Sequence, residues 1–163
     1  MVQDDPSLLR RLNQNGVEFV IIGGFCGTLH GMSLVTYDLD VCCPFKPENL
    51  RRIEAAVSDI HPFHRLTANK LPFELTDELC ASLKNLYLQT DLGRLDCLGE
   101  VKGIGGYEDV LKVSVAGEAT FGEFRMLSID ALIASKEAVG RDKDLMALKQ
   151  LYGIQEKVRT KRN

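Results

Sequence analysis

The stretches VIIGG (residues 20–24) and DLDV (residues 38–41) decide the expected fold of this 163-residue chain. The first closes an apolar run over residues 17–22 that is rich in β-branched side chains, which predicts a strand that breaks at the two glycines. The second belongs to an alternating acidic and apolar run over residues 37–43, which predicts another strand. Residues 25–31 predict a short helix between the two strands.

Two acidic residues of the second strand carry its chemistry. Residues two apart in a strand point to the same face, so Asp38 and Asp40 present their carboxylates together while Leu39 points into the core. Carboxylates this close repel each other unless a cation lies between them, so without metal we expect at least one raised pKa. Hard oxygen ligands at this spacing suit Mg²⁺ or Mn²⁺, which often also hold a triphosphate. An Asp-x-Asp pair alone is more often a solvated strand edge.

A third carboxylate, that of Asp96, occurs in a similar setting. Residues 94–98 alternate apolar and polar side chains, and they predict a hairpin with residues 86–90. If this strand lies beside that of Asp38 and Asp40, Asp96 completes a carboxylate triad. Such a triad can hold two metal ions and deprotonate an attacking hydroxyl.

The rest of the chain predicts further helices and one more hairpin. The first helix starts at Asp5, which serves as its N-cap, and Pro6. Ser128 and Asp142 can cap two closing helices. Strands mixed with helices predict an α/β or α+β domain, in which helices pack against a mixed β-sheet. The remaining predicted elements are a helix from Pro47 and a hairpin of residues 113–116 with residues 123–127.

Composition indicates a globular protein. Hydrophobic residues make up 45% of the chain, charged residues 26%, and the formal net charge is −3, which argues against disorder and against a globally basic nucleic-acid binder. No apolar run reaches the roughly 20 residues of a membrane span. The acidic N-terminal segment lacks the apolar core of a signal peptide. We expect a single domain over residues 1–155, followed by a solvated basic tail over residues 156–163.

Cysteine usage indicates the compartment. The chain has five cysteines, which is an odd number, and their spacing is not that of a zinc site. We therefore expect reduced, mostly buried thiols in a cytoplasmic protein. These residues are Cys26, Cys42, Cys43, Cys80 and Cys97.

Three stretches together resemble a known family pattern. They are IGG (22–24) with TYDLDV (36–41), TDLGRLD (90–96), and SKEAVGRDKDL (135–145). An apolar-Gly-Gly turn followed by an Asp-apolar-Asp-apolar strand is similar to the signature of the nucleotidyltransferase fold, the polymerase-beta-like superfamily. Within it, the chain resembles the small bacterial nucleotidyltransferase-like proteins related to the AbiEii toxin family, which implies a toxin–antitoxin setting.

The resemblance implies a role for each residue that matches the pattern. Asp38 and Asp40 would bind the metal ions that carry the nucleoside triphosphate. Asp96 would be the third carboxylate, acting as a metal ligand and as the base. Backbone N–H groups at a strand-to-helix turn can hold phosphate, and a long cation can contact a triphosphate or form an ion pair instead. The residues implied to contact the nucleotide are Gly23 and Gly24, and those implied to approach it or to stabilise the site are Lys136, Lys143 and Asp144.

The implied function is metal-dependent nucleotidyl transfer. With Mg²⁺ or Mn²⁺ as the cofactor, a hydroxyl of RNA, a protein or a small molecule would attack the α-phosphate of a nucleoside triphosphate such as ATP. A partner chain or a homodimer would supply the acceptor-binding surface that so short a chain lacks. Two departures from the family are the absence of an Arg at residues 33–35 and Ala147 in place of an Asp. They favour the alternative, a catalytically weak nucleotide- or protein-binding module of the same fold.

Overall fold

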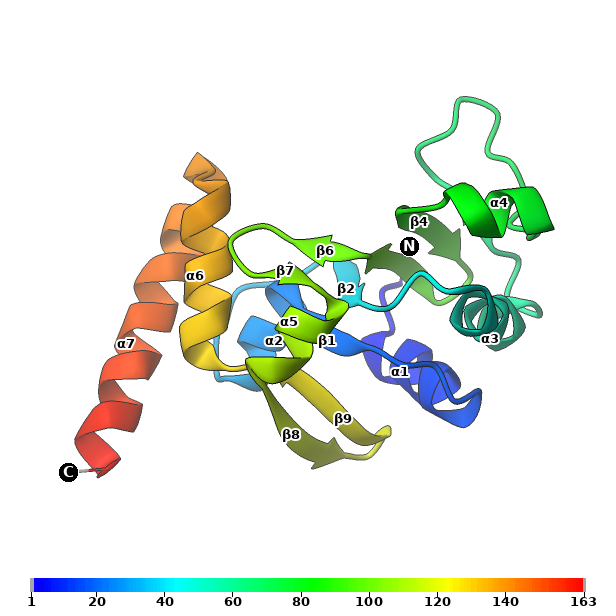
Figure 1. Cartoon of the computed structure of the whole chain (residues 1–163). Coiled ribbons are helices and arrows are strands. Elements are labelled where there is room, and N and C mark those ends of the chain that lie inside the picture. The colour runs from blue at the N-terminus through cyan, green and yellow to red at the C-terminus, as the bar shows by residue number, and fades with distance from the viewer. Residues whose placement is uncertain (1, 163) are drawn as a thin grey trace.

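The computed structural model describes residues 2–162 and is built around a mixed β-sheet (Figure 1). Residues 1 and 163 lie outside the described residues. The strands are β1 (Val20–Ile22), β2 (Asp38–Cys42), β3 (Phe63–His64), β4 (Asn85–Thr90), β5 (Gly93–Leu98), β6 (Glu100–Val101), β7 (Gly105–Gly106), β8 (Ser114–Ala119) and β9 (Gly122–Leu127). The main sheet has seven strands in the order β3-β4-β5-β2-β1-β9-β8, and β6 pairs with β7 alone.

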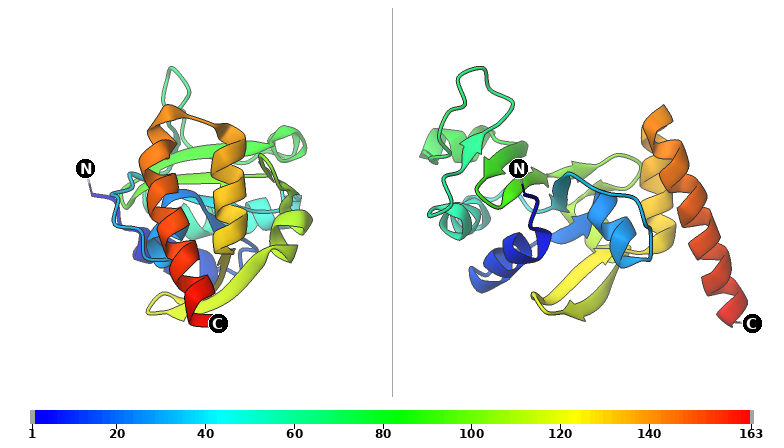
Figure 2. Two further views of the ribbon diagram at one scale, coloured as in Figure 1. Left: turned by 90° about the vertical axis from the view of Figure 1, so that its left-hand side faces the viewer. Right: turned by 180° about the vertical axis from the view of Figure 1, so that it is seen from behind.

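The helices gather mainly at the two ends of the sheet. They are α1 (Asp5–Gln14), α2 (Gly23–Leu29), α3 (Pro47–Val57), α4 (Asp77–Ser82), α5 (Tyr107–Lys112), α6 (Ile129–Val139), the 3₁₀ helix η1 (Asp142–Asp144) and α7 (Leu145–Arg162). Helices α6 and α7 lie side by side at one end, and α1 and α3 pack together at the other (Figure 2). Helix α2 packs against β1 and β2 and also contacts α6.

The order of the central strands brings the acidic residues together. Strand β2 runs antiparallel to β1 and parallel to β5, and Asp40 lies opposite Asp96. In the same register Asp38 lies opposite Arg94. Leu39 is fully buried, as the alternation predicts. Residues opposite each other on paired strands share a face, so the three carboxylates lie on one face of the sheet.

The mixed α/β architecture and both predicted hairpins, β4–β5 and β8–β9, are confirmed. Two helix starts differ from the prediction. Asp4, not Asp5, caps α1, because its Oδ1 accepts the backbone N–H of Ser7 at 3.1 Å. Helix α2 begins at Gly23 rather than at Phe25, because Gly23 adopts a φ of +67° and turns the chain directly out of β1.

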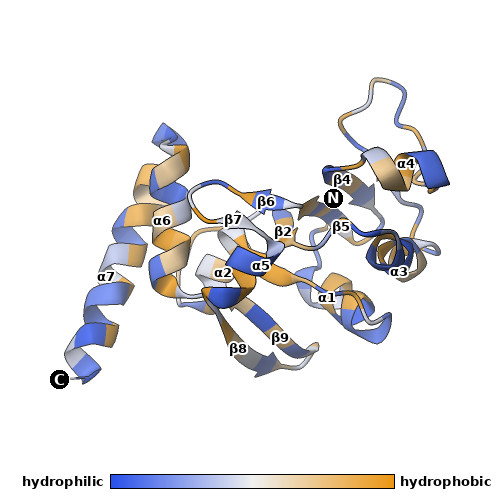
Figure 3. Cartoon of the chain, in the orientation of Figure 1, coloured by the Kyte–Doolittle hydropathy of each residue, from blue (hydrophilic) through white to orange (hydrophobic). Residues whose placement is uncertain are grey.

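The C-terminal segment is helical as far as the described residues extend. Asp142 does not cap α7, because it opens the 3₁₀ helix η1, which runs directly into α7. Residues 156–162, most of the predicted basic tail, form the largely exposed last turns of α7. Figure 3 shows that hydrophilic residues predominate there. Basic side chains in the last turn suit the negative end of the helix dipole, which favours continuation of the helix.

A single hydrophobic cluster fills the space between the sheet and its helices. The apolar stripe of α1, formed by Leu8, Leu9 and Leu12, is fully buried in it. All five cysteines are free and buried, as predicted. Within residues 2–162 there is no helix whose length and apolar character would let it cross a membrane.

Candidate functional site

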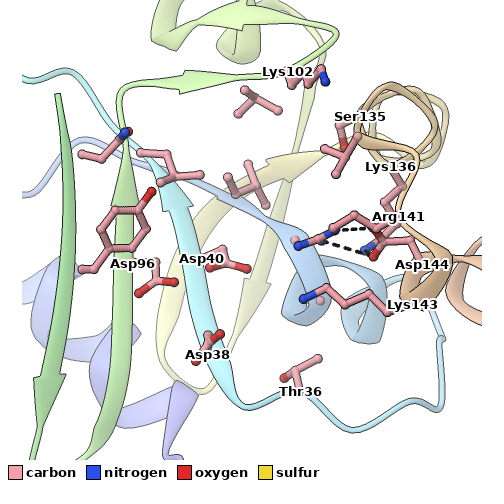
Figure 4. A pocket seen from close by; sticks show the side chains of 18 of the residues that line it. Thr36, Asp38, Asp40, Asp96, Lys102, Ser135, Lys136, Arg141, Lys143 and Asp144 are labelled. Carbon is pink, nitrogen blue, oxygen red and sulfur yellow. Dashed lines mark hydrogen bonds and ion pairs between the residues drawn. The ribbon is translucent and has the colours of Figure 1, made fainter. Parts of the chain in front are cut away.

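A cavity of about 570 Å³ lies between the acidic face of the sheet and the end of α6 with the following turn (Figure 4). Side chains of opposite charge enter it from the two sides: carboxylates from β2 and β5, and cations from α6, η1 and the loop between them. Every site residue singled out from the sequence lines this cavity: Gly23, Gly24, Asp38, Asp40, Asp96, Lys136, Lys143 and Asp144.

Asp40 is the central residue of the acidic wall, because it lies between Asp38 on its own strand and Asp96 on the next. Burial, together with the charges of Asp96 and Asp38, raises the pKa of Asp40 from 3.8 to about 7, and the charge of Lys136 opposes this rise only in part. This agrees with the expectation that crowded carboxylates raise at least one pKa. A carboxyl group with so high a pKa lacks a sufficient counter-charge, so this wall favours the approach of a cation.

The other two carboxylates have arginine partners. Both terminal nitrogens of Arg65 donate to Asp96, with an Nη2–Oδ2 distance of 2.9 Å, and this pair is largely buried. Arg94 Nη1 lies 3.5 Å from Asp38 Oδ1, and this pair is more exposed. Sequence reasoning missed Arg65, because it follows β3, an edge strand of only two residues that leaves no periodic pattern.

The glycine pair permits a close approach of the chain to the acids. A Cβ atom on Gly23 would lie 2.4 Å from Oδ2 of Asp40, and Gly23 also has a positive φ. A Cβ atom on Gly24 would lie 2.4 Å from Cγ2 of Thr36. Only glycine fits at Gly23 without moving Asp40. The start of α2 therefore borders the cavity with bare backbone.

Asp144 anchors the basic wall. Its carboxylate accepts a hydrogen bond from Arg141 Nε at 2.7 Å and lies 3.6 Å from Lys136 Nζ. Burial alone would raise the pKa of Asp144, but the hydrogen bond from Arg141 and the charge of Lys136 bring it below its ordinary value. Asp144 therefore holds two cations in place beside the cavity. Lys143 and Lys102 add further positive charge to the lining.

Two of these cations were not singled out from the sequence. Arg141 lies within the third resembling stretch, and its spacing of three residues from Asp144 was the available signal. Lys102 comes from the β6–β7 hairpin, which the sequence did not predict. That hairpin packs against α6, since a Cβ atom on Gly103 would lie 2.7 Å from Cβ of Ala138.

The acidic wall offers carboxylate oxygens, which are the ligands that Mg²⁺ and Mn²⁺ prefer, so its chemistry suits a divalent cation. Burial and the neighbouring charges of Asp96 and Asp38 raise the pKa of Asp40, and a cation bound at this wall would favour its ionised form. Asp96 is engaged by Arg65, and within the described part of the chain no three His, Cys, Asp or Glu side chains are grouped as metal ligands. Asp38 and Asp40 are therefore the two donors not bound to a buried cation.

Comparison with solved structures shows that the chain has a nucleotidyltransferase fold. A Thermotoga maritima protein classed as a nucleotidyltransferase superimposes with a TM-score of 0.56 at 17% identity, covering 93% of this chain and 96% of that chain. ANT(2″)-Ia, solved in complex with adenylyl-2″-tobramycin, superimposes with a TM-score of 0.52 at 16% identity, covering 96% of this chain and 95% of that chain. No family model and no curated protein matches the sequence.

Proposed function

We propose that this chain is a nucleotidyltransferase that moves a nucleoside monophosphate from a nucleoside triphosphate to an acceptor hydroxyl, with Mg²⁺ or Mn²⁺ as the cofactor. The observation that carries the proposal is the opposition of charge across one cavity, with carboxylates from β2 and β5 facing cations from the α6–α7 region. A metal–triphosphate complex has the complementary pattern, because its cation pairs with carboxylates and its phosphates pair with lysine and arginine.

The two walls would divide the chemistry. Asp38 and Asp40 would hold the divalent ion, which when bound supplies a counter-charge to the triphosphate and polarises the α-phosphate. Asp96, opposite Asp40, would accept the proton of the attacking hydroxyl. Lys136 and Arg141 would bind the phosphates and stabilise the negative charge that develops on the departing pyrophosphate. Gly23 and Gly24 would let the backbone approach those phosphates.

The acceptor class stays open in this proposal. ANT(2″)-Ia was solved with an adenylyl-tobramycin, which makes a small-molecule hydroxyl one candidate. RNA and protein hydroxyls are the others, and a partner chain or a second copy would complete the surface that binds them. The AbiEii relationship, with its toxin–antitoxin setting, and the single domain over residues 1–155 stay predictions from the sequence.

The alternative is a nucleotide- or protein-binding module of the same fold with weak catalysis. The specific observation in its favour is the Arg65–Asp96 ion pair, in which both carboxylate oxygens already accept hydrogen bonds. These two hydrogen bonds leave Asp96 fewer free lone pairs with which to accept a proton from a hydroxyl.

Labelled transfer separates the two functions. The protein is incubated with Mg²⁺ and α-³²P-labelled ribonucleoside triphosphates against three separate pools: total RNA, total protein and a small-molecule extract. We expect label in at least one pool with the wild type and none with Asp40→Asn, which keeps the shape of the side chain. Asp91→Asn, which removes an exposed acid bound to His61, should behave as the wild type. Nucleotide binding without label in any pool would favour the binding module.

A further inference from the structure

Arg65 holds Asp96 more firmly than a surface ion pair would. Its Nη1 and Nη2 donate to the two different oxygens of the carboxylate, and the Nη2–Oδ2 distance is 2.9 Å. The side chains of Arg65 and Asp96 are only 16% and 9% exposed, so water screens the pair little. Paired hydrogen bonds of this kind fix both the position and the orientation of the carboxylate.

The backbone around Arg65 aims its side chain at Asp96. The N–H of Arg65 donates to the carbonyl oxygen of Tyr87 at 3.1 Å, which ties the chain after β3 to β4. Its guanidinium lies over the ring of Tyr87, 5.6 Å from the centroid. Tyr87 pairs with Asp96 in the β4–β5 register. The guanidinium therefore reaches past β4 to β5, with the aromatic face as its support.

This arrangement stands in the way of a metal ion at Asp96. A guanidinium that donates to both oxygens engages about half of the four lone-pair sites of the carboxylate and places a positive charge against it, and both effects oppose the approach of a divalent ion. Asp40, directly opposite, has no such partner. An ion held by Asp40 would meet the positive charge of Arg65 close by, and it would find its next carboxylate already occupied.

We propose that Arg65 is a positioning residue that competes with a divalent cation for Asp96. Asp96 becomes the third metal ligand only when Arg65 gives up at least one of its two hydrogen bonds. This inference rests on the proposed function, because it needs the metal site at Asp38 and Asp40. It means that Arg65 keeps metal binding weak as long as the guanidinium stays on Asp96.

Equilibrium binding of Mn²⁺ alone tests the competition. The free ion is counted by electron paramagnetic resonance at room temperature, with no nucleotide present, for the wild type and four variants. Arg65→Gln removes the charge and the paired hydrogen bonds. Arg65→Lys keeps the charge but not the paired geometry. Arg94→Gln is the matched control, because Arg94 has only a single 3.5 Å contact with Asp38. Asp40→Asn tests the metal site itself.

We expect Arg65→Gln to bind Mn²⁺ at least about tenfold more tightly than the wild type, the effect of releasing even one hydrogen bond to a charged group. Arg65→Lys should lie between the two, Arg94→Gln should change the Kd by less than about threefold, and Asp40→Asn should lose binding. Circular dichroism checks the fold of each variant. If Arg65→Gln does not fold, the comparison of Arg65→Lys with the wild type decides, and it must bind more tightly.

Three results would overturn the inference. An unchanged Kd in Arg65→Gln, with binding lost in Asp40→Asn, would refute the role of Arg65 alone and leave the metal site standing. An equal gain in Arg94→Gln and Arg65→Gln would show a general effect of charge rather than competition for Asp96. No Mn²⁺ binding by any form of the protein would refute both the competition and the metal site of the proposed function.

Discussion

Asp40→Asn should raise the free energy of unfolding, most of all above pH 7. In the folded protein, burial and the charges of Asp96 and Asp38 raise the pKa of Asp40 from 3.8 to about 7. Between these two values the unfolded chain has lost the Asp40 proton while the folded chain keeps it. The wild type therefore loses stability as the pH rises from about 4 to about 7, and the loss persists at higher pH. Asn cannot ionise, so the substitution removes this loss.

The magnitude follows from the difference between the two pKa values. A rise from 3.8 to about 7 corresponds to roughly 4 kcal/mol once Asp40 is fully ionised, at about 1.4 kcal/mol for each pKa unit. We expect Asp40→Asn to exceed the wild type in stability by up to about 4 kcal/mol at pH 8. The gain should be less than half as large at pH 5, because the folded carboxyl group is then protonated.

Urea unfolding in the presence of EDTA, followed by circular dichroism at pH 5 and pH 8, measures this difference. Asp38→Asn is the matched control, because Asp38 lies on the same face of the same strand but has Arg94 at 3.5 Å. It should change stability by no more than about 1 kcal/mol. An Asp40→Asn protein that is no more stable than the wild type at pH 8, or one whose gain is equal at both pH values, would show that Asp40 does not have a raised pKa in the folded protein.

Three further substitutions test the packing around the site. Gly23→Ala should cost about 1–3 kcal/mol of unfolding free energy and weaken Mn²⁺ binding, because its Cβ would displace the Asp40 carboxylate. Its control is Gly16→Ala, since Gly16 has a similar positive φ and open space around it. This control should leave Mn²⁺ binding unchanged in the same titration. Leu39→Ala should cost about 2–5 kcal/mol in urea unfolding, since the side chain is fully buried. Asp144→Asn should cost about 1–3 kcal/mol at pH 7. That cost should shrink as the pH falls through the lowered pKa of Asp144 and the wild type loses the same interaction, which a pH series of melting curves would show.

The acidic wall was predictable because its information is local. Alternation along one strand places Asp38 and Asp40 on the same face and Leu39 in the core, and the structure has this arrangement. The position of Asp96 needed one further assumption, that its strand lies beside the first, which the parallel pairing of β2 with β5 supplies. A single-residue shift of that pairing would have turned Asp96 to the other face.

The rest of the site depends on contacts that leave no pattern in the sequence. Arg65 follows β3 and Lys102 follows β6, and each of these strands has only two residues, too few for any periodicity. Only the tertiary structure brings Arg65 to Asp96 and Lys102 to the cavity. Asp144 is the buried partner of Arg141, three residues before it, and the pattern of the sequence alone did not indicate this ion pair. The helical continuation through residues 156–162 was also missed, because a run of basic residues does not by itself indicate where a helix ends.

The proposed function requires that the cavity bind a metal–triphosphate between walls of opposite charge. Its most direct test is calorimetric titration of the wild type with the α,β-methylene analogues of the four ribonucleoside triphosphates, with Mg²⁺ and with EDTA. We expect at least one analogue to bind the wild type in the presence of Mg²⁺. Its Kd should rise at least about tenfold when EDTA replaces Mg²⁺, and by a similar factor when Asp40→Asn is titrated with Mg²⁺ present. The same Kd in all three measurements, or no heat of binding from any analogue, would contradict binding of a metal–triphosphate in this cavity.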